Sequence, residues 1–205
     1  MLEKTKIAVL VSGGGTNLQA LIDAEKSGII KSGEIVLVVS SRSDAYALTR
    51  AANAGIKGVA VNRKDCRDLA EFEEKITAEL EKAGIEMIVL AGFMSILSAD
   101  FISKYRDRII NVHPALIPSF CGEGMYGLKV HEAALSYGVK VTGATVHFVN
   151  EIPDGGKIIL QKAVDIEPDD TPETLQKRVM ENAEWILLPR ACEIVANEIA
   201  KGKGE

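Results

Sequence analysis

The sequence predicts an α/β protein with a doubly wound, mostly parallel open sheet, helices on both faces and an antiparallel C-terminal addition. Short runs rich in Val and Ile recur along the first half of the chain, and segments of helical periodicity separate them. The runs are apolar along their whole length, which is typical of strands covered on both faces. The expected parallel strands are Ile7 to Val11, Ile35 to Val39, Val59 to Val61, Met87 to Ala91 and Ile109 to Val112.

The segments between these strands are predicted to be helices that bury one stripe of side chains. Leu18, Leu21 and Ile22 share one helical face, and the segment from Leu69 to Leu80 repeats the pattern. Right-handed crossovers through such helices build an open sheet, whose ligands bind beyond the carboxyl ends of its strands. Site residues are therefore expected directly after strands.

The pattern changes after Val112. A Gly-rich loop, Pro118 to Gly127, precedes a short helix around Val130 to Tyr137. Two further strand-like runs, VKVTGATVHFV and KIILQKAVDI, are expected to pair antiparallel through a turn at Asn150 to Gly156.

The closing segment is predicted to be a long helix. Thr171 is a suitable N-cap and Pro172 suits the first helical position. Pro189 is expected to interrupt the helix, because a proline inside a helix loses a hydrogen bond and clashes with the preceding turn.

Composition limits the classes of function. The 205 residues, 47% of them hydrophobic, suit one domain spanning 1–205. A formal charge of -5 gives no general basic surface for nucleic acid or an anionic membrane. The five-residue apolar run near the N-terminus is too short for a signal peptide or a membrane span, so a cytoplasmic protein is expected. Three scattered cysteines predict neither a disulfide framework nor a zinc site.

The first candidate motif is Ser12 to Asn17, SGGGTN, between the first strand and the first helix. Glycines let a backbone approach an anion closely, and the free amides at a helix N-terminus supply donors. The motif therefore predicts a phosphate loop. A tight turn without a ligand is the alternative.

Asn111 and His113 form the second candidate motif, at the end of the fifth strand. The two-residue period of a strand points both side chains to one face, where they supply an amide donor and an imidazole acid or base. On spacing alone, a structural histidine is as good an explanation as a catalytic one.

The other two candidate motifs have plain structural alternatives. Asp154, Gly155 and Gly156 form an ordinary turn signal, but a carboxylate that returned toward His147 would orient an imidazole. Ala91 to Leu97 is an apolar loop that either walls a cleft for a flat ring or packs into the core. His131 is expected on the surface or as a cap.

Five motifs follow one another along the chain: SGGGTN, VLAGFMSIL, NVHPALIPSF, GATVHFV and DGGKIILQ. In this order they resemble the motifs of the glycinamide ribonucleotide formyltransferases, in the folate-dependent formyltransferase family. The resemblance extends from about Ile7 to Pro189. It implies a formyltransferase fold and transfer of a formyl group from 10-formyltetrahydrofolate to the amine of glycinamide ribonucleotide in purine biosynthesis. It implies two small-molecule substrates and no metal, and we expect a monomer or a homodimer.

The resemblance also implies roles for individual residues. Asn111, His113 and Asp154 would form the catalytic set, supported by His147 and Pro114. The phosphate and sugar of the ribonucleotide would contact Gly13, Gly14, Gly15, Thr16, Asn17 and Glu184. The folate would contact Met94, Ser95, Ile96, Leu97, Asn150, Glu151, Ile152, Pro153 and Asp154.

Three departures affect the periphery of this pattern. Ser95 stands where many members have Arg, and Trp185 stands where many have His. The loop from Phe120 to Gly127 is longer than the commonest form. These differences concern the folate's acidic tail and loop closure, and they leave the catalytic set intact.

Rival functions remain at this point. A formyltetrahydrofolate deformylase would use water as the acceptor, and would have no need of a phosphate anchor for its second substrate. An NADP-dependent oxidoreductase could use Arg42, just past the second strand, but the glycine spacing departs from the dinucleotide fingerprint. A non-catalytic nucleotide sensor would keep the phosphate loop without needing an oxyanion donor.

Overall fold

The computed structural model describes residues 3–203; residues 1–2 and 204–205, the ends of the expected 1–205 domain, lie outside it. Its strands are β1 (Thr5–Val11), β2 (Gly33–Ser40), β3 (Lys57–Ala60), β4 (Met87–Leu90), β5 (Ile109–His113), β6 (Val141–Phe148) and β7 (Ile158–Asp165). Its α-helices are α1 (Thr16–Lys26), α2 (Tyr46–Asn53), α3 (Leu69–Lys82), α4 (Ala99–Lys104), α5 (Leu128–Tyr137), α6 (Pro172–Val179) and α7 (Trp185–Gly202).

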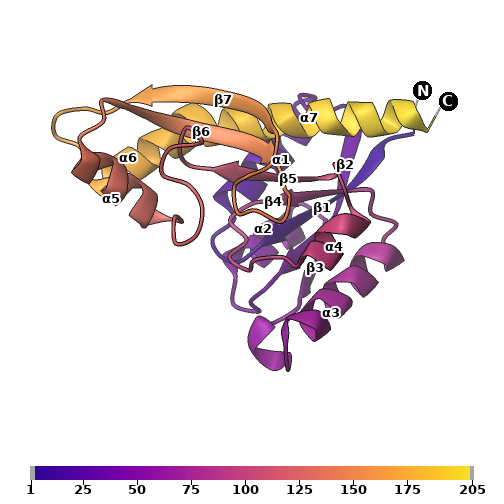
Figure 1. Cartoon of the computed structure of the whole chain (residues 1–205). Helices are drawn as coiled ribbons and strands as arrows, with labels where there is room; N and C mark the ends of the chain where they lie inside the picture. The colour runs from indigo at the N-terminus through magenta and orange to yellow at the C-terminus, as the bar shows by residue number, and fades with distance from the viewer. Residues whose placement is uncertain (1–2, 204–205) are drawn as a thin grey trace.

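One sheet organises the described residues, in the strand order β3-β2-β1-β4-β5-β6-β7. Strands β1 to β5 pair in parallel, whereas β6 runs antiparallel to β5 and β7 antiparallel to β6. Figure 1 shows the β6–β7 extension and helices α5 and α6 at one end of the molecule. The predicted fold class is confirmed, and the predicted strands coincide with the observed ones to within two residues at either end.

Hydrophobic side chains cover both faces of the sheet, which explains the continuous apolar strands. Along β1, Val9 and Val11 belong to the core that includes α1 and α7, and Leu10 belongs to the core beneath α3. Figure 1 shows α7 along one side of the sheet and α3 with α4 on the other. Each strand therefore buries alternate residues in different cores.

The C-terminal helical segment differs from its prediction at Pro189. Thr171 caps α6 in a capping box with Thr174, and Pro172 occupies the first turn, as predicted. Helix α7 continues through Pro189, so the predicted interruption is wrong. The irregularity lies one turn earlier, in the π-helical turn Met180–Glu184, and Pro189 is only the fifth residue of α7, where its missing N–H costs one bond to Trp185.

The strand order reverses at β1, whose neighbours lead to opposite edges of the sheet. Two loops leave the carboxyl ends of β1 and β4 at this point, and hydrogen bonds join them. The amide of Ser12 donates to the carbonyl of Gly92 (3.1 Å), and the amide of Met94 donates to the hydroxyl of Ser12 (2.9 Å). The fold thus brings the first and fourth candidate motifs together where open sheets bind ligands.

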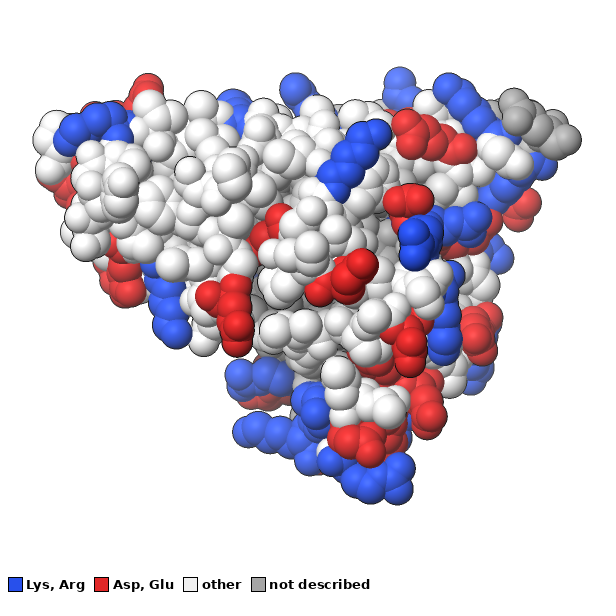
Figure 2. All heavy atoms as spheres, in the orientation of Figure 1, with Lys and Arg blue, Asp and Glu red and all other residues white. Residues whose placement is uncertain are grey.

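Charged groups of both signs are interspersed on the face shown in Figure 2. Around α3 they form pairs, such as Lys57 with Glu79 (2.7 Å) and Lys75 with Glu71 (2.9 Å). Within residues 3–203, the structure contains no helix with the length and hydrophobicity that crossing a membrane requires.

Candidate active site

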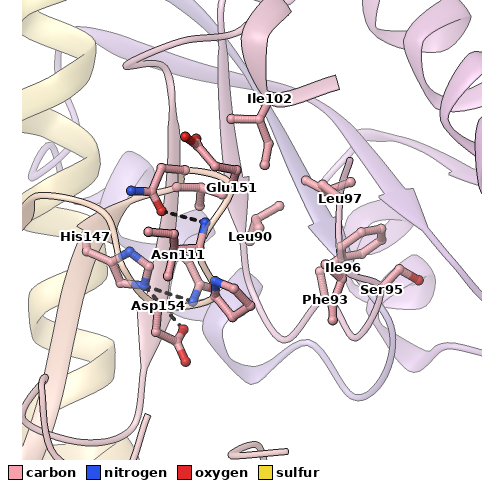
Figure 3. A pocket seen from close by; sticks show the side chains of 14 residues that line it. Leu90, Phe93, Ser95, Ile96, Leu97, Ile102, Asn111, His147, Glu151 and Asp154 are labelled. Atoms are coloured by element: carbon pink, nitrogen blue, oxygen red, sulfur yellow. Dashed lines mark hydrogen bonds and ion pairs between the residues drawn. The ribbon is translucent and has the colours of Figure 1, made fainter. Parts of the chain in front are cut away.

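A polar cluster lies where β5 and β6 meet the turn that follows β6. The pairing of the two strands sets Asn111 opposite His147, and the Asn111 Nδ2 atom lies 3.3 Å from His147 Nε2. Asp154 reaches both histidines: its Oδ1 is 3.5 Å from His147 Nε2, and its Oδ2 is 3.4 Å from His113 Nδ1. Figure 3 shows Asn111, His147 and Asp154 directed toward one another. The second and third candidate motifs therefore belong to one site.

The Asp154 carboxylate is held in place by a strained turn. The residue has a φ of 56°, a conformation that Asp tolerates better than most residues. The amide of Gly122 donates to its Oδ2 at 2.9 Å. Burial on its own would raise the pKa of Asp154, but the hydrogen bonds from His147 and Gly122 and the nearby His113 bring that pKa below its usual value. Asp154 is therefore ionised at neutral pH.

His113 is almost fully buried, and the Gly-rich loop covers it. Its Nε2 atom lies 2.8 Å from the carbonyl oxygen of Phe120, a residue held at a φ of 49°. Burial lowers the pKa of His113, and the opposing effects of Asp154 and the Phe120 carbonyl do not fully compensate. The imidazole is therefore neutral at pH 7, but the Asp154 carboxylate and the Phe120 carbonyl are placed to accept hydrogen bonds from its charged form.

Two adjoining cavities open onto this cluster, with volumes of about 140 and 310 Å³. Leu90, Leu97, Ile102 and Val149 give the smaller cavity an apolar wall, shown in part in Figure 3. All nine residues predicted to contact the folate line one or both cavities, and so do Asn111, His113, Pro114 and His147.

The SGGGTN loop has the geometry of an anion site. Gly15 has a φ of 73° and packs so closely against α2 that a Cβ atom would lie 2.7 Å from that of Ala47. Within the described residues, the backbone amides of residues 14–17 donate to no protein acceptor. These free N–H groups at the start of α1 are available to a phosphate.

Glu184 connects this loop to the larger cavity. Asn17 Nδ2 donates to Glu184 Oε2 at 2.8 Å, and both residues line the cavity, whereas Gly13, Gly14, Gly15 and Thr16 do not. Burial raises the pKa of Glu184, and the Asn17 hydrogen bond only partly opposes this shift. The π-helical turn Met180–Glu184 places this carboxylate, and such turns are frequent at functional sites.

His131 does not lie where the sequence predicted. The prediction of a surface or cap position is wrong, because the His131 side chain is fully buried and lines the larger cavity. Neither ring nitrogen has a hydrogen-bond partner among residues 3–203, and burial together with nearby His113 lowers the pKa of His131 to about 4. A signal was present in the sequence: His131 falls on the apolar stripe of α5 that includes Val130 and Ala134.

The contacts that hold the loops in place involve residues that the sequence patterns do not single out. The Ser12 and Ser41 hydroxyls lie 2.7 Å apart in the interior, and Ser12 holds the backbone of Met94. Glu73, from α3, accepts the amide of Ser98 at 2.6 Å, where the Ala91 to Leu97 loop ends. Neither pair is close in sequence, so no local pattern reveals it.

Two further predictions concern residues outside this cluster. Arg42 is exposed and directs its guanidinium at Asp44, with contacts of 2.9 and 2.6 Å.

Among residues 3–203, no three His, Cys, Asp or Glu side chains are grouped to hold a metal ion, and Cys66, Cys121 and Cys192 are free thiols.

Residues 5–192 match the family model described as formyl transferase. A phosphoribosylglycinamide formyltransferase from Haemophilus influenzae is 42% identical over 86% of this chain and 80% of its own length. The trifunctional purine biosynthetic protein adenosine-3 of Gallus gallus is 45% identical over 95% of this chain, which spans only 19% of that relative. The solved structure of glycinamide ribonucleotide transformylase 1 from Symbiobacterium toebii superposes with a TM-score of 0.89 at 37% identity, covering 95% of this chain and 89% of the other.

Proposed function

The chain belongs to the formyl transferase family, and we propose that it transfers a formyl group from 10-formyltetrahydrofolate to the amine of glycinamide ribonucleotide in purine biosynthesis. The observation that carries this proposal is that Asn111, His113 and Asp154 line two adjoining cavities, and that the larger cavity also reaches Asn17 at the end of the loop of free amides. A folate ring and a phosphorylated acceptor would meet at the polar cluster.

Asn111 and His113 would stabilise the negative charge that develops during the reaction. The amine attacks the formyl carbon, and the carbonyl oxygen of the tetrahedral intermediate becomes an oxyanion. Asn111 Nδ2 can donate to this oxygen, and so can His113 Nε2 once the oxygen replaces the Phe120 carbonyl as its acceptor. Negative charge beside His113 raises the pKa of that imidazole, which strengthens the hydrogen bond when it is most needed.

Asp154 would orient His113 and assist proton transfer. A bond forms between the amine nitrogen and the formyl carbon, and the bond from that carbon to the folate nitrogen breaks. One amine proton must reach the departing nitrogen, and the ionised Asp154 carboxylate can move it through a water molecule. The sequence of steps requires no covalent bond to the protein.

The remaining site residues would bind and align the two substrates. The amides of residues 14–17 can hold the ribonucleotide phosphate, and Glu184 can accept hydrogen bonds from the sugar hydroxyls. Met94 to Leu97 and Asn150 to Asp154 can enclose the folate ring. Binding energy from the remote phosphate then positions the amine at the formyl carbon.

Absorbance of 10-formyltetrahydrofolate tests the proposal directly. Its consumption by the purified protein should require glycinamide ribonucleotide and should disappear in His113→Ala. Asn111→Ala should be similarly impaired, whereas Asn53→Ala, an exposed amide at the end of α2, serves as the matched control. Consumption without the ribonucleotide would identify a deformylase. No consumption at all would favour a nucleotide sensor or, if nicotinamide fluorescence is quenched on titration, an oxidoreductase.

A further inference from the structure

The three glycine carbonyls of the SGGGTN loop all have donors on the protein. The Gly13 carbonyl accepts from the amide of Ala47 (3.1 Å), and the Gly15 carbonyl accepts from the amide of Gln19 (2.9 Å). The Gly14 carbonyl accepts from the side chain of Arg50, with Nε at 2.8 Å. Two of these three donors belong to α2, so this helix fixes the orientation of the loop peptides.

The orientation of a carbonyl determines the orientation of the next amide. In a planar trans peptide, the C=O bond and the following N–H bond point in opposite directions. Arg50 holds the Gly14 carbonyl on its own side and thereby turns the Gly15 amide the other way. A carbonyl oxygen facing a phosphate would repel it, so this contact removes an acceptor from the anion site and presents a donor.

The Arg50 guanidinium is also a charge beside the loop. Its Nη1 donates to Gln19 Oε1 (3.1 Å), and its centre lies 5.1 Å from the ring centroid of Tyr46. Within residues 3–203, it forms no ion pair with a carboxylate. Its positive charge is therefore not neutralised, in contrast to that of Arg42, which pairs with Asp44.

The larger cavity next to the loop has no Lys or Arg among its described lining residues, and burial lowers the pKa of both histidines that line it, His113 and His131. Three acidic residues, Glu123, Asp154 and Glu184, also line it. These surroundings are mostly acidic, so a cation at the loop would strengthen the binding of a phosphate dianion. Charges near a protein surface interact over several ångströms.

We propose that Arg50 is the positioning residue of the anion site: it orients the Gly14–Gly15 peptide and supplies the positive charge that favours a phosphorylated acceptor over the unphosphorylated riboside. The inference rests on the proposed function for the identity of the acceptor. In this arrangement the SGGGTN loop binds a sugar phosphate through backbone amides, and Arg50 holds those amides in place.

Titration calorimetry with ribose 5-phosphate tests this inference without any catalytic step. Arg50→Met should weaken binding about tenfold, equivalent to about 1.4 kcal/mol. Arg50→Lys keeps the charge but loses the fork of donors, so its dissociation constant should lie between those of the wild type and Arg50→Met. Arg42→Met is the matched control, because it removes an arginine that does not contact the loop, and it should bind like the wild type.

Steady-state kinetics gives the second measurement. Arg50→Met should raise the KM for glycinamide ribonucleotide about tenfold, while kcat and the KM for 10-formyltetrahydrofolate stay within about twofold. Competitive inhibition by the unphosphorylated riboside should be unchanged. Equal weakening of riboside and ribonucleotide would mean general damage to the site and would overturn the inference, as would an unchanged affinity of Arg50→Met for ribose 5-phosphate.

The two proposals fail separately. If the wild type transfers no formyl group but Arg50→Met still loses affinity for ribose 5-phosphate, the anion site stands and the proposed reaction does not. If the wild type is active and Arg50→Met binds and reacts normally, the reaction stands and the role of Arg50 does not.

Discussion

The Oδ2 atom of Asp154 lies 3.4 Å from Nδ1 of His113, so that an ionised carboxylate faces a neutral imidazole across a buried gap. Burial keeps the imidazole neutral, whereas the facing carboxylate favours the imidazolium form, so further negative charge nearby would shift the balance toward that form. The pair therefore responds to the transition state more than to the substrate, and such interactions raise kcat rather than affinity.

Asp154→Asn should lower kcat on the order of 10²-fold or more, with little change in either KM, because it removes the charge but keeps the side-chain shape. The measurement is steady-state kinetics with both substrates varied. Asp107→Asn is the control, because Asp107 also has a positive φ (57°) but lies in the exposed turn after α4. Equal activity of the wild type and Asp154→Asn would remove this carboxylate from the mechanism.

Gly15→Ala should weaken ribonucleotide binding and destabilise the protein by about 1–3 kcal/mol. The added Cβ would lie 2.7 Å from the Ala47 Cβ and 2.9 Å from its Cα, so α2 must move away from the loop. Thermal denaturation and calorimetry measure the two effects. Gly28→Ala separates the causes, because Gly28 has a φ of 77° but open space around its Cβ. Similar losses in both variants would mean that backbone strain, not the approach of α2, explains the effect.

Glu184→Gln should make the unliganded protein more stable and the ribonucleotide complex weaker. Among the described residues the buried Glu184 carboxylate accepts a hydrogen bond from Asn17 alone, so removing its charge relieves a desolvation cost. Bound sugar hydroxyls would lose a charged acceptor, which weakens affinity by roughly 1.5–3 kcal/mol. Chemical denaturation and calorimetry provide the two values.

The control for Glu184→Gln is Glu193→Gln, because the Glu193 carboxylate accepts three hydrogen bonds from Lys31 and Ser32. This variant should be destabilised and should bind the ribonucleotide normally. If Glu184→Gln also lost stability without ligand, the carboxylate would be a structural element of the π-helical turn instead of a binding group.

The sequence predicts the sheet and the position of Asn111 and His113 for the same reason. Apolar runs define the strands, and the rule that ligands bind beyond their carboxyl ends places Asn111 and His113 at the site. The contact of Gly15 with Ala47 and the pairing of Ser12 with Ser41 could not be predicted, because they depend on how closely α2 and the loops approach in three dimensions. The error at Pro189 has another origin: the π-helical turn just before α7 places this proline near the start of that helix, and a helical pattern in the sequence does not reveal such a turn.

The pKa of His131 predicts a specific loss of stability at acidic pH. The folded-state value of about 4 lies below the ordinary 6.5, because burial disfavours the charged imidazole. The unfolded chain therefore binds more protons between these values, and stability falls as the pH drops from about 6.5 toward 4. The difference of about 2.5 pKa units corresponds to about 3 kcal/mol at the acidic limit.

His131→Leu should remove this pH-dependent component, because leucine fits the apolar stripe and does not titrate. Urea denaturation of both proteins at several pH values between 4 and 8 gives the difference in unfolding free energy, and titrations of the shared carboxylates largely cancel in that difference. The gap between the variant and the wild type should widen in favour of the variant as the pH falls. A gap that stays constant with pH would mean that His131 keeps an ordinary pKa, and that the buried imidazole has a partner such as water or ligand.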